Sequence, residues 1–147
     1  MKNQDFTATL LVDQNPEEVF AAINNIRGWW SEDIEGDTDK LNHEFMYRDK
    51  HLRSKMKITE LIPGKKVVWY VLESQMDNFE GGTEWNDTKL VFEITKTDDK
   101  TNIQFTHSGL VPKFECYTVC SKAWDFYIKS SLRRLITTNK GEPIKKK

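Results

Sequence analysis

A long amphipathic segment near the C-terminal end of the chain is the feature that most restricts the possible folds. From Tyr117 to Thr137, apolar residues recur at spacings of three and four: Cys120, Trp124, Tyr127, Ile128, Leu132, Leu135 and Ile136. This spacing predicts one helix with an apolar face. Gly141 and Pro143 follow as stop signals. At about 1.5 Å per residue the helix is about 30 Å long, and its apolar face needs a large partner surface.

The preceding sequence predicts six strands that could form this surface. Residues 6–12 alternate between apolar and polar positions, which is typical of a half-buried strand. The other candidate strands are 41–47, 54–62, 66–74, about 88–94 and 103–107. Pro63-Gly64 and the segment 97–100 have the composition of tight turns. Short connections of this kind predict antiparallel pairing.

A short helical pair is predicted between the first two strands. Asn15 is a good cap residue, Pro16 suits the first helical position, and Glu18 completes a capping box. Gly28 is expected to end or bend the segment before Trp29 and Trp30. The polar residues 31–40 predict a surface loop, and residues 75–87, with Gly81-Gly82, predict another loop near one end of the sheet.

This order of elements predicts an α+β protein with one domain over residues 1–147. A single helix covers only a strip of a six-stranded sheet, so we expect the sheet to curve around it, with the helix across the concave face. If curving leaves more space than the side chains fill, the remainder is an apolar pocket that opens near the loops.

Charge and hydropathy exclude several classes of function. The 22 lysines and arginines nearly balance the 23 aspartates and glutamates, so the net charge is −1. This balance supplies no long-range attraction for nucleic acid or anionic lipid. No apolar stretch approaches the roughly 20 residues of a membrane span, and the N-terminus lacks the apolar region of an export signal. We therefore expect a cytoplasmic protein that binds no nucleic acid and has no membrane span.

Motifs for metals, cofactors and catalysis are missing from the sequence. Cys116 and Cys120 could share one helix face, but a zinc site needs more ligands than these two, and the three histidines are widely scattered. No glycine-rich phosphate loop precedes a helix, and Ser108 lacks the G-x-S-x-G pattern of an exposed nucleophile. We expect no metal, no cofactor and no identifiable catalytic residues.

Aromatic residues are the strongest pointer to a ligand. Phe, Trp and Tyr together make up 12% of the chain, which is a large amount of flat apolar surface for this size. The side chains that we expect near the pocket are Trp30, Trp69, Phe92, Phe105, His107, Trp124, Tyr127 and Ile128. For any one of these aromatics taken singly, plain core packing is the more common role.

His107 is the most interesting titratable residue. It has the same parity as Ile103 and Phe105, so it faces the pocket if they do. A buried neutral imidazole could hold the polar group of a ligand, transfer a proton near neutral pH, or be a core histidine with its hydrogen bonds satisfied. The sequence leaves these alternatives open.

Several short segments, in order along the chain, resemble a known group of proteins. They are 15–20 (NPEEVF), 28–31 (GWWS), 58–69 (ITELIPGKKVVW), 88–92 (TKLVF), 105–110 (FTHSGL) and 124–143. With them the chain resembles the START-like helix-grip superfamily, and within it the group related to activators of the heat-shock protein 90 ATPase. The resemblance implies the fold more than an activity, because similar domains serve as lipid or hormone binders, enzymes and co-chaperones.

Three hypotheses about function follow. The favoured one is a non-enzymatic carrier or sensor of a small hydrophobic molecule, such as a lipid, an aromatic compound or a polyketide, with His107 or Tyr127 fixing a polar group. The second is a stress-related co-chaperone that docks its outer surface on a heat-shock protein 90 partner. The third is an enzyme that acts on an apolar cyclic substrate by proton transfer from His107.

Overall fold

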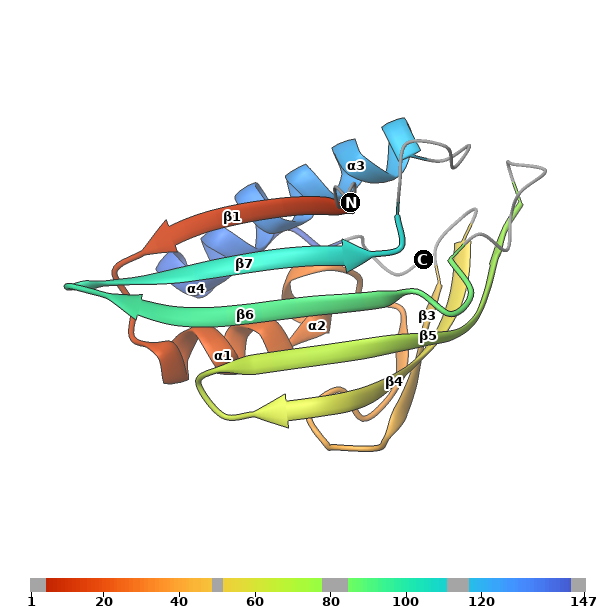
Figure 1. The fold of residues 1–147 in the computed structure, drawn as a ribbon, viewed down its shortest axis with the longest axis horizontal. Coiled ribbons are helices and arrows are strands. Elements are labelled where there is room, and N and C mark those ends of the chain that lie inside the picture. The colour runs from red at the N-terminus through yellow and green to blue at the C-terminus, as the bar shows by residue number, and fades with distance from the viewer. Residues whose placement is uncertain (1–4, 49–51, 78–84, 111–116, 144–147) are drawn as a thin grey trace, which may run out of the picture.

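The computed structural model describes residues 5–48, 52–77, 85–110 and 117–143. In these residues one antiparallel sheet is combined with two short helices and a long C-terminal helix (Figure 1). The strands are β1 (Phe6–Val12), β2 (Ile34–Gly36), β3 (Glu44–Arg48), β4 (Leu52–Ile62), β5 (Lys66–Met76), β6 (Lys89–Thr97) and β7 (Lys100–Ser108). The helices are α1 (Pro16–Asn24), α2 (Ile26–Trp29) and a run of α3 (Tyr117–Phe126), η1 (Tyr127–Leu132) and α4 (Arg133–Thr138).

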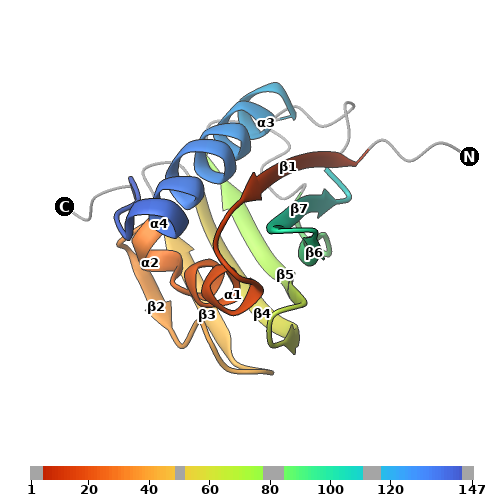
Figure 2. The ribbon, with the colours of Figure 1, turned by 90° about the vertical axis from the view of Figure 1, so that its left-hand side faces the viewer.

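The sheet has the order β1-β7-β6-β5-β4-β3-β2. β1 therefore pairs with β7, with Phe6 opposite His107 and Val12 opposite Thr101. Figure 2 shows the sheet curving from β1 round to β2, with the helices inside the curve. Residues that face the helices alternate with exposed residues, as on β1, where Phe6, Ala8, Leu10 and Val12 are buried. The predicted α+β helix-grip fold is confirmed.

The sheet has seven strands in the described residues, one more than predicted. The additional strand, β2, lies within residues 31–40, for which the polar sequence predicted a loop. It has only three residues, of which Glu35 and Gly36 are exposed, so no apolar alternation marks it. Arg27 Nη2 donates to the carbonyl oxygens of Ile34 (2.8 Å) and Gly36 (2.9 Å). The guanidinium thereby provides hydrogen-bond donors for carbonyl groups at this edge of the sheet.

The predicted capping box begins α1. The backbone N–H of Glu18 donates to Asn15 Oδ1 at 2.8 Å, and the backbone N–H of Asn15 donates to Glu18 Oε1 at 3.2 Å. The break between α1 and α2 falls at Asn25 rather than at Gly28, which lies inside α2. A side chain at Gly28 would meet Asn25 and Leu135, so this glycine allows α2 to pack closely against α4.

The long hairpin of β4 and β5 extends beyond its predicted bounds, from Leu52 to Met76. Its turn contains Gly64 at φ +71°, a conformation that favours glycine. The register of the two strands shifts between Lys55 and Met56 and again between Ile58 and Glu60. Irregularities of this kind bend and twist a strand pair, which helps this part of the sheet to curve.

The C-terminal helix runs without interruption from Tyr117 to Thr138, as the apolar spacing predicted. Its middle part, η1, is a π-helical segment. Asn139 adopts a left-handed conformation and ends the helix. Gly141 then lies against the carbonyl group of Gly28. None of the helices in the described residues is long and apolar enough to cross a membrane.

Candidate functional site

The eight residues predicted to line a pocket come together inside the curved sheet. Sheet strands contribute Trp69 (β5), Phe92 (β6), Phe105 and His107 (β7); Trp30 follows α2, and Trp124, Tyr127 and Ile128 come from the C-terminal helix. Tyr127 is half-buried, and the other seven are at most 2% exposed. The residues named from the sequence therefore lie in one interior region.

The aromatic rings among them form one continuous set, which we call the aromatic cluster: Trp30, Trp69, Phe92, Phe105, Trp124 and Tyr127, joined by Trp29 and Trp85. The ring centroids of Phe105 lie 4.9 Å from Phe92 and 4.6 Å from Trp124. Such distances are those of aromatic rings in contact. The cluster therefore packs against itself, and a ligand has to lie against it or displace part of it.

His107 joins the sheet to the C-terminal helix through hydrogen bonds. The indole Nε1–H of Trp124 donates to His107 Nδ1 at 3.1 Å. Because Nδ1 accepts, the neutral ring carries its proton on Nε2, which lies 2.9 Å from Thr88 Oγ1. The Thr88 hydroxyl donates in turn to the carbonyl oxygen of Trp85 at 2.6 Å. His107 and Thr88 each accept from one neighbour and donate to the next.

Burial fixes the charge of His107. The loss of solvation lowers the pKa of its imidazole from 6.5 to about 3, so the ring is neutral at pH 7. Protonation at Nδ1 would also place an N–H donor opposite the Trp124 indole N–H, and the hydrogen bond between these two residues would be lost. These contacts favour a structural or ligand-facing histidine and disfavour the proton-transfer hypothesis.

Two indole donors in the aromatic cluster lack acceptors. The Nε1 atoms of Trp69 and Trp85 are buried, and neither has a hydrogen-bond partner in the described part of the chain. By contrast, Trp29 Nε1 donates to the carbonyl oxygen of Ile23 at 3.0 Å. Trp85 stacks on Trp124 with centroids 5.9 Å apart and contacts the His107 ring edge-on at 4.7 Å. One unsatisfied donor therefore lies beside the histidine.

Sequence reasoning missed Trp85, Thr88 and Trp29 as parts of this region. Trp85 lies in the predicted loop at 75–87, although a tryptophan in a polar segment is a sign of a buried anchor. Trp29 lies next to Trp30 and contacts Trp69 at 6.4 Å. The sequence predicts only that Thr88 begins a strand, since no sequence pattern shows that a hydroxyl will meet an imidazole.

Metal-binding groups are not clustered in the described residues: no three His, Cys, Asp or Glu side chains lie close enough to hold an ion. The side chain of Cys120 is buried in α3. Cys116, its predicted neighbour on the helix, lies outside the described residues, as does most of the loop predicted around Gly81-Gly82.

Known proteins with this fold include several bacterial examples. The solution structure of the Aha1 dimer from Colwellia psychrerythraea is 23% identical, covers 93% of this chain and 98% of that chain, and gives a TM-score of 0.75. Protein SSP2350 from Staphylococcus saprophyticus is 15% identical over 94% of this chain and 95% of its own, with a TM-score of 0.65. CalU16 from Micromonospora echinospora is 14% identical over 90% of this chain and 76% of its own, with a TM-score of 0.63. At these identities the similarity shows the fold alone.

Sequence comparison shows the family. No curated protein matched the chain. The family described as "Activator of Hsp90 ATPase homolog 1-like protein" matches residues 13–137, which is most of the chain. The matched region starts just after β1 and ends in α4, so it includes the whole aromatic cluster. This protein therefore belongs to the Activator of Hsp90 ATPase homolog 1-like family, within the START-like helix-grip superfamily.

Proposed function

We propose that this protein binds a small hydrophobic molecule that carries a hydrogen-bond acceptor, at the end of the aromatic cluster formed by Trp85, His107 and Trp124. The observation that carries the proposal is the buried indole N–H of Trp85, which has no acceptor among the described residues. A buried donor without a partner costs about 1–3 kcal/mol. A carbonyl or hydroxyl oxygen of a ligand would recover that free energy.

Apolar contact supplies the larger part of the expected affinity. A ligand that buries about 200 Å² of apolar surface gains roughly 5 kcal/mol before the costs of association. A micromolar dissociation constant corresponds to about 8 kcal/mol. Polar contacts therefore have to contribute, and Trp85 suits this role better than His107, because both ring nitrogens of His107 already have partners.

The topology favours one end of the sheet for entry of the ligand. Antiparallel order places the ends of β3, β5 and β7 at the same end as the starts of β4 and β6, and α3 also begins there (Figure 1). His107 is the next-to-last residue of β7, and Trp85 lies just before β6. Loops that connect strands are the usual place where a ligand site opens. The aromatic rings at this end have to separate to admit a ligand.

The indole resonances of the five tryptophans test the proposal. We expect a titration with a fatty acid, a flavonoid or a polycyclic aromatic ketone to shift the Trp85 Nε1–H resonance downfield and saturably in ¹H–¹⁵N spectra. The resonance of Trp29 is the internal control, because that indole already donates to Ile23. Trp85→Phe should weaken binding about tenfold, because about 1.4 kcal/mol of hydrogen bonding is lost.

A second ligand separates the hydrogen bond from apolar contact. The hydrocarbon analogue of the same ligand, without the acceptor, should bind the wild-type protein and Trp85→Phe equally. The proposal is wrong if no compound of these classes binds saturably. It is also wrong if a bound ligand does not shift the Trp85 Nε1–H resonance.

A second function, stimulation of a heat-shock protein 90 type ATPase, is favoured by the family match over residues 13–137. The Colwellia psychrerythraea protein, named Aha1, matches over nearly its full length, so its similarity does not depend on an additional domain. Measuring ATP turnover of such a chaperone with and without this protein tests the idea. An unchanged rate, together with no complex on a sizing column, would exclude it.

A further inference from the structure

Buried polar atoms without a partner gather at one end of the interior. Six side chains in the described residues contain such an atom, and three of them lie at the end where β4 begins and β5 ends: Ser54, Trp85 and Ser121. They come from β4, from the segment before β6 and from α3. Because buried polar groups are normally hydrogen-bonded, unsatisfied groups from three elements indicate a site that a bound molecule completes.

Ser54 faces the interior of the curved sheet. It is 0% exposed, and it shares its face of β4 with Met56 and Ile58, which are core residues. The residue opposite it is Tyr47 on β3 and Ser74 on β5. Residues in such opposite positions lie side by side on one face of a sheet. The Ser54 hydroxyl has no hydrogen-bond partner in the described part of the chain.

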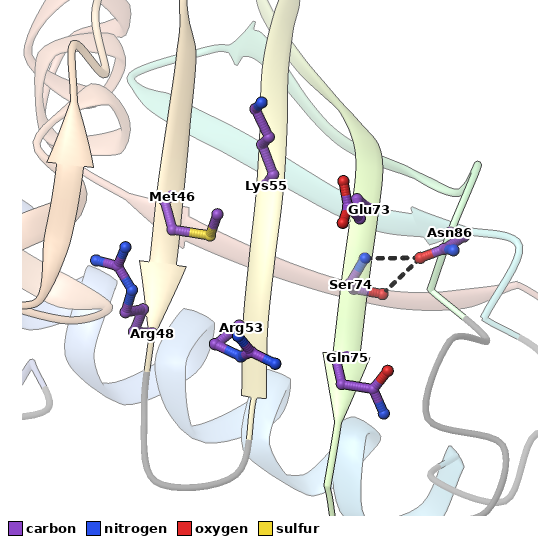
Figure 3. Close-up of a pocket in the computed structure, with 8 residues that line it drawn as sticks. All are labelled: Met46, Arg48, Arg53, Lys55, Glu73, Ser74, Gln75 and Asn86. Carbon is purple, nitrogen blue, oxygen red and sulfur yellow. Dashed lines mark hydrogen bonds between the residues drawn. The ribbon is translucent and has the colours of Figure 1, made fainter.

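Hydrogen bonds bring the segment that contains Trp85 to the level of Ser54. Asn86 Oδ1 accepts from the backbone N–H (2.7 Å) and from the hydroxyl (3.1 Å) of Ser74 (Figure 3). Ser74 is opposite Ser54 on the neighbouring strand, and Asn86 directly follows Trp85 in the sequence. The chain before β6 is thereby fixed against β5 at the position next to Ser54.

Aromatic rings connect the same two residues on the side of the helices. Trp85 stacks on Trp124 with centroids 5.9 Å apart, and the ring of Trp124 lies 5.0 Å from that of Trp30. Trp30 in turn stacks on Tyr47 at 4.1 Å, and Tyr47 is opposite Ser54. One connection through the sheet and one through the rings therefore surround a single region, which the Trp85 indole N–H and the Ser54 hydroxyl both border.

Ser121 borders this region from the C-terminal helix. It precedes Trp124 by three residues and Ile128 by seven, so the three side chains share one face of the helix. Its hydroxyl oxygen is buried and has no partner among the described residues. The helix therefore adds a second unsatisfied hydroxyl, one turn from the tryptophan that stacks on Trp85.

The described interior contains no charged group for an ion to pair with. None of its buried side chains belongs to Lys, Arg, Asp or Glu, and the buried His107 is neutral at pH 7. An ion that enters such a region loses its hydration without compensation. A hydroxyl group fits better, because its oxygen accepts from the Trp85 N–H while its proton is donated to Ser54 Oγ.

We infer that the polar end of the ligand is an uncharged hydroxyl group held between Trp85 and Ser54. The inference rests on the hydrophobic-ligand function proposed above and specifies its chemical class: an alcohol or a phenol rather than an ether, a ketone or a carboxylate. Ser54 is the residue that determines this specificity. It accepts the hydroxyl proton of the ligand, which the indole of Trp85 cannot do because an indole only donates.

Two matched series of compounds test the inference. They are 1-decanol and 2-naphthol, each with its methyl ether and with its carboxylate counterpart, decanoate or 2-naphthoate. In at least one series, at pH 7, the alcohol should bind about five- to tenfold more tightly than the ether, which cannot donate to Ser54. It should bind more than about tenfold more tightly than the carboxylate, which has to lose its hydration.

The substitution Ser54→Ala separates the hydrogen bond from the size of the methyl group. It should weaken binding of the alcohol about five- to tenfold and leave binding of the ether within about twofold, as in a double-mutant cycle. Ser130→Ala is the matched control, because it removes a serine hydroxyl at the surface of the same protein, and both affinities should stay within about twofold. Unliganded Ser54→Ala should melt no lower than the wild type, since its hydroxyl has no partner to lose.

Three results would overturn the inference: an equal loss of alcohol and ether binding in Ser54→Ala, no loss of either, or a carboxylate that binds as tightly as its alcohol. Failure of both alcohols to bind, while a polycyclic aromatic ketone still shifts the Trp85 resonance saturably, would also overturn it. The hydrophobic-ligand function would then stand, and only the hydroxyl class would be wrong. If no compound of any series binds, both the function and this inference are wrong.

Discussion

His107 lies where the sheet, the segment before β6 and the C-terminal helix meet. Its two ring nitrogens contact Trp124 in α3 and Thr88 just before β6, which are far apart in sequence. The imidazole therefore acts as a polar connection in an interior that is mostly apolar. In a low-dielectric environment such a connection stabilises the fold only while every member has its partner.

The pH dependence of stability should report this buried histidine. The unfolded chain binds a proton at His107 below pH 6.5, whereas the folded chain does so only near pH 3, because burial lowers the pKa to about 3. Stability is therefore lost as the pH falls from 6.5 toward 3. Between pH 6 and pH 4 we expect the wild-type protein to lose about 2–3 kcal/mol more than His107→Gln, measured by urea denaturation. Parallel curves for the two proteins would show that His107 is not buried in neutral form.

At the scale of the elements, the C-terminal helix is anchored through its π-helical segment. Ser131 is fully buried in η1; its hydroxyl donates to the carbonyl oxygen of Trp29 at 2.6 Å and accepts from the backbone N–H of Glu142 at 2.7 Å. The same side chain thus joins the helix to the end of α2 and to the segment that follows α4. A π-helical turn changes which residues face the core, and here it contains the serine that makes both contacts.

Replacing Ser131 should destabilise the protein more than replacing its neighbour. Ser131→Ala leaves the Trp29 carbonyl and the Glu142 N–H without this partner, and we expect a loss of about 1–3 kcal/mol in chemical denaturation. Ser130→Ala is the matched control, since its hydroxyl makes only a surface hydrogen bond to Glu142 Oε1 at 2.9 Å, and it should cost less than about 0.5 kcal/mol. Equal effects of the two substitutions would show that the buried contacts do not anchor the helix.

At the scale of the whole molecule, the aromatic cluster connects the curved sheet to the helices. Trp30 is central: its ring lies 4.1 Å from that of Tyr47, 5.0 Å from that of Trp124 and 6.0 Å from that of Trp69. These partners come from β3, α3 and β5. Large aromatic side chains in such positions contribute much of the core's stability, because each buries a large apolar area.

Truncation of this central ring should therefore be costly. We expect Trp30→Ala to lower the free energy of unfolding by about 3–5 kcal/mol, with an unchanged denaturant dependence, because it leaves a cavity in a packed interior. Leu41→Ala, at a side chain that is 48% exposed, should change it by less than about 0.5 kcal/mol. A loss below about 1 kcal/mol for Trp30→Ala would contradict the close packing of the cluster.

Much of the architecture and of the candidate site could be predicted from local patterns. The alternation in residues 6–12 and the spacing from Cys120 to Ile136 identified β1 and the C-terminal helix, because half-buried strands and helices repeat with different periods. The same periods correctly placed Phe105 and His107 on one face. The short strand β2 and the role of Trp85 escaped prediction, since each depends on contacts with distant residues, such as Arg27 with β2 and Trp124 with Trp85.

The sequence by itself determined the order and type of the main elements, the capping of α1 by Asn15 and six of the aromatic residues that meet inside the sheet: Trp30, Trp69, Phe92, Phe105, Trp124 and Tyr127. Only the tertiary structure decided that these aromatic rings pack against one another, that His107 carries its proton on Nε2, and that Ser131 joins the C-terminal helix to the end of α2. The physical reason is that periodicity is local, whereas ring contacts, hydrogen-bond partners and charge clusters depend on how distant segments are brought together in space.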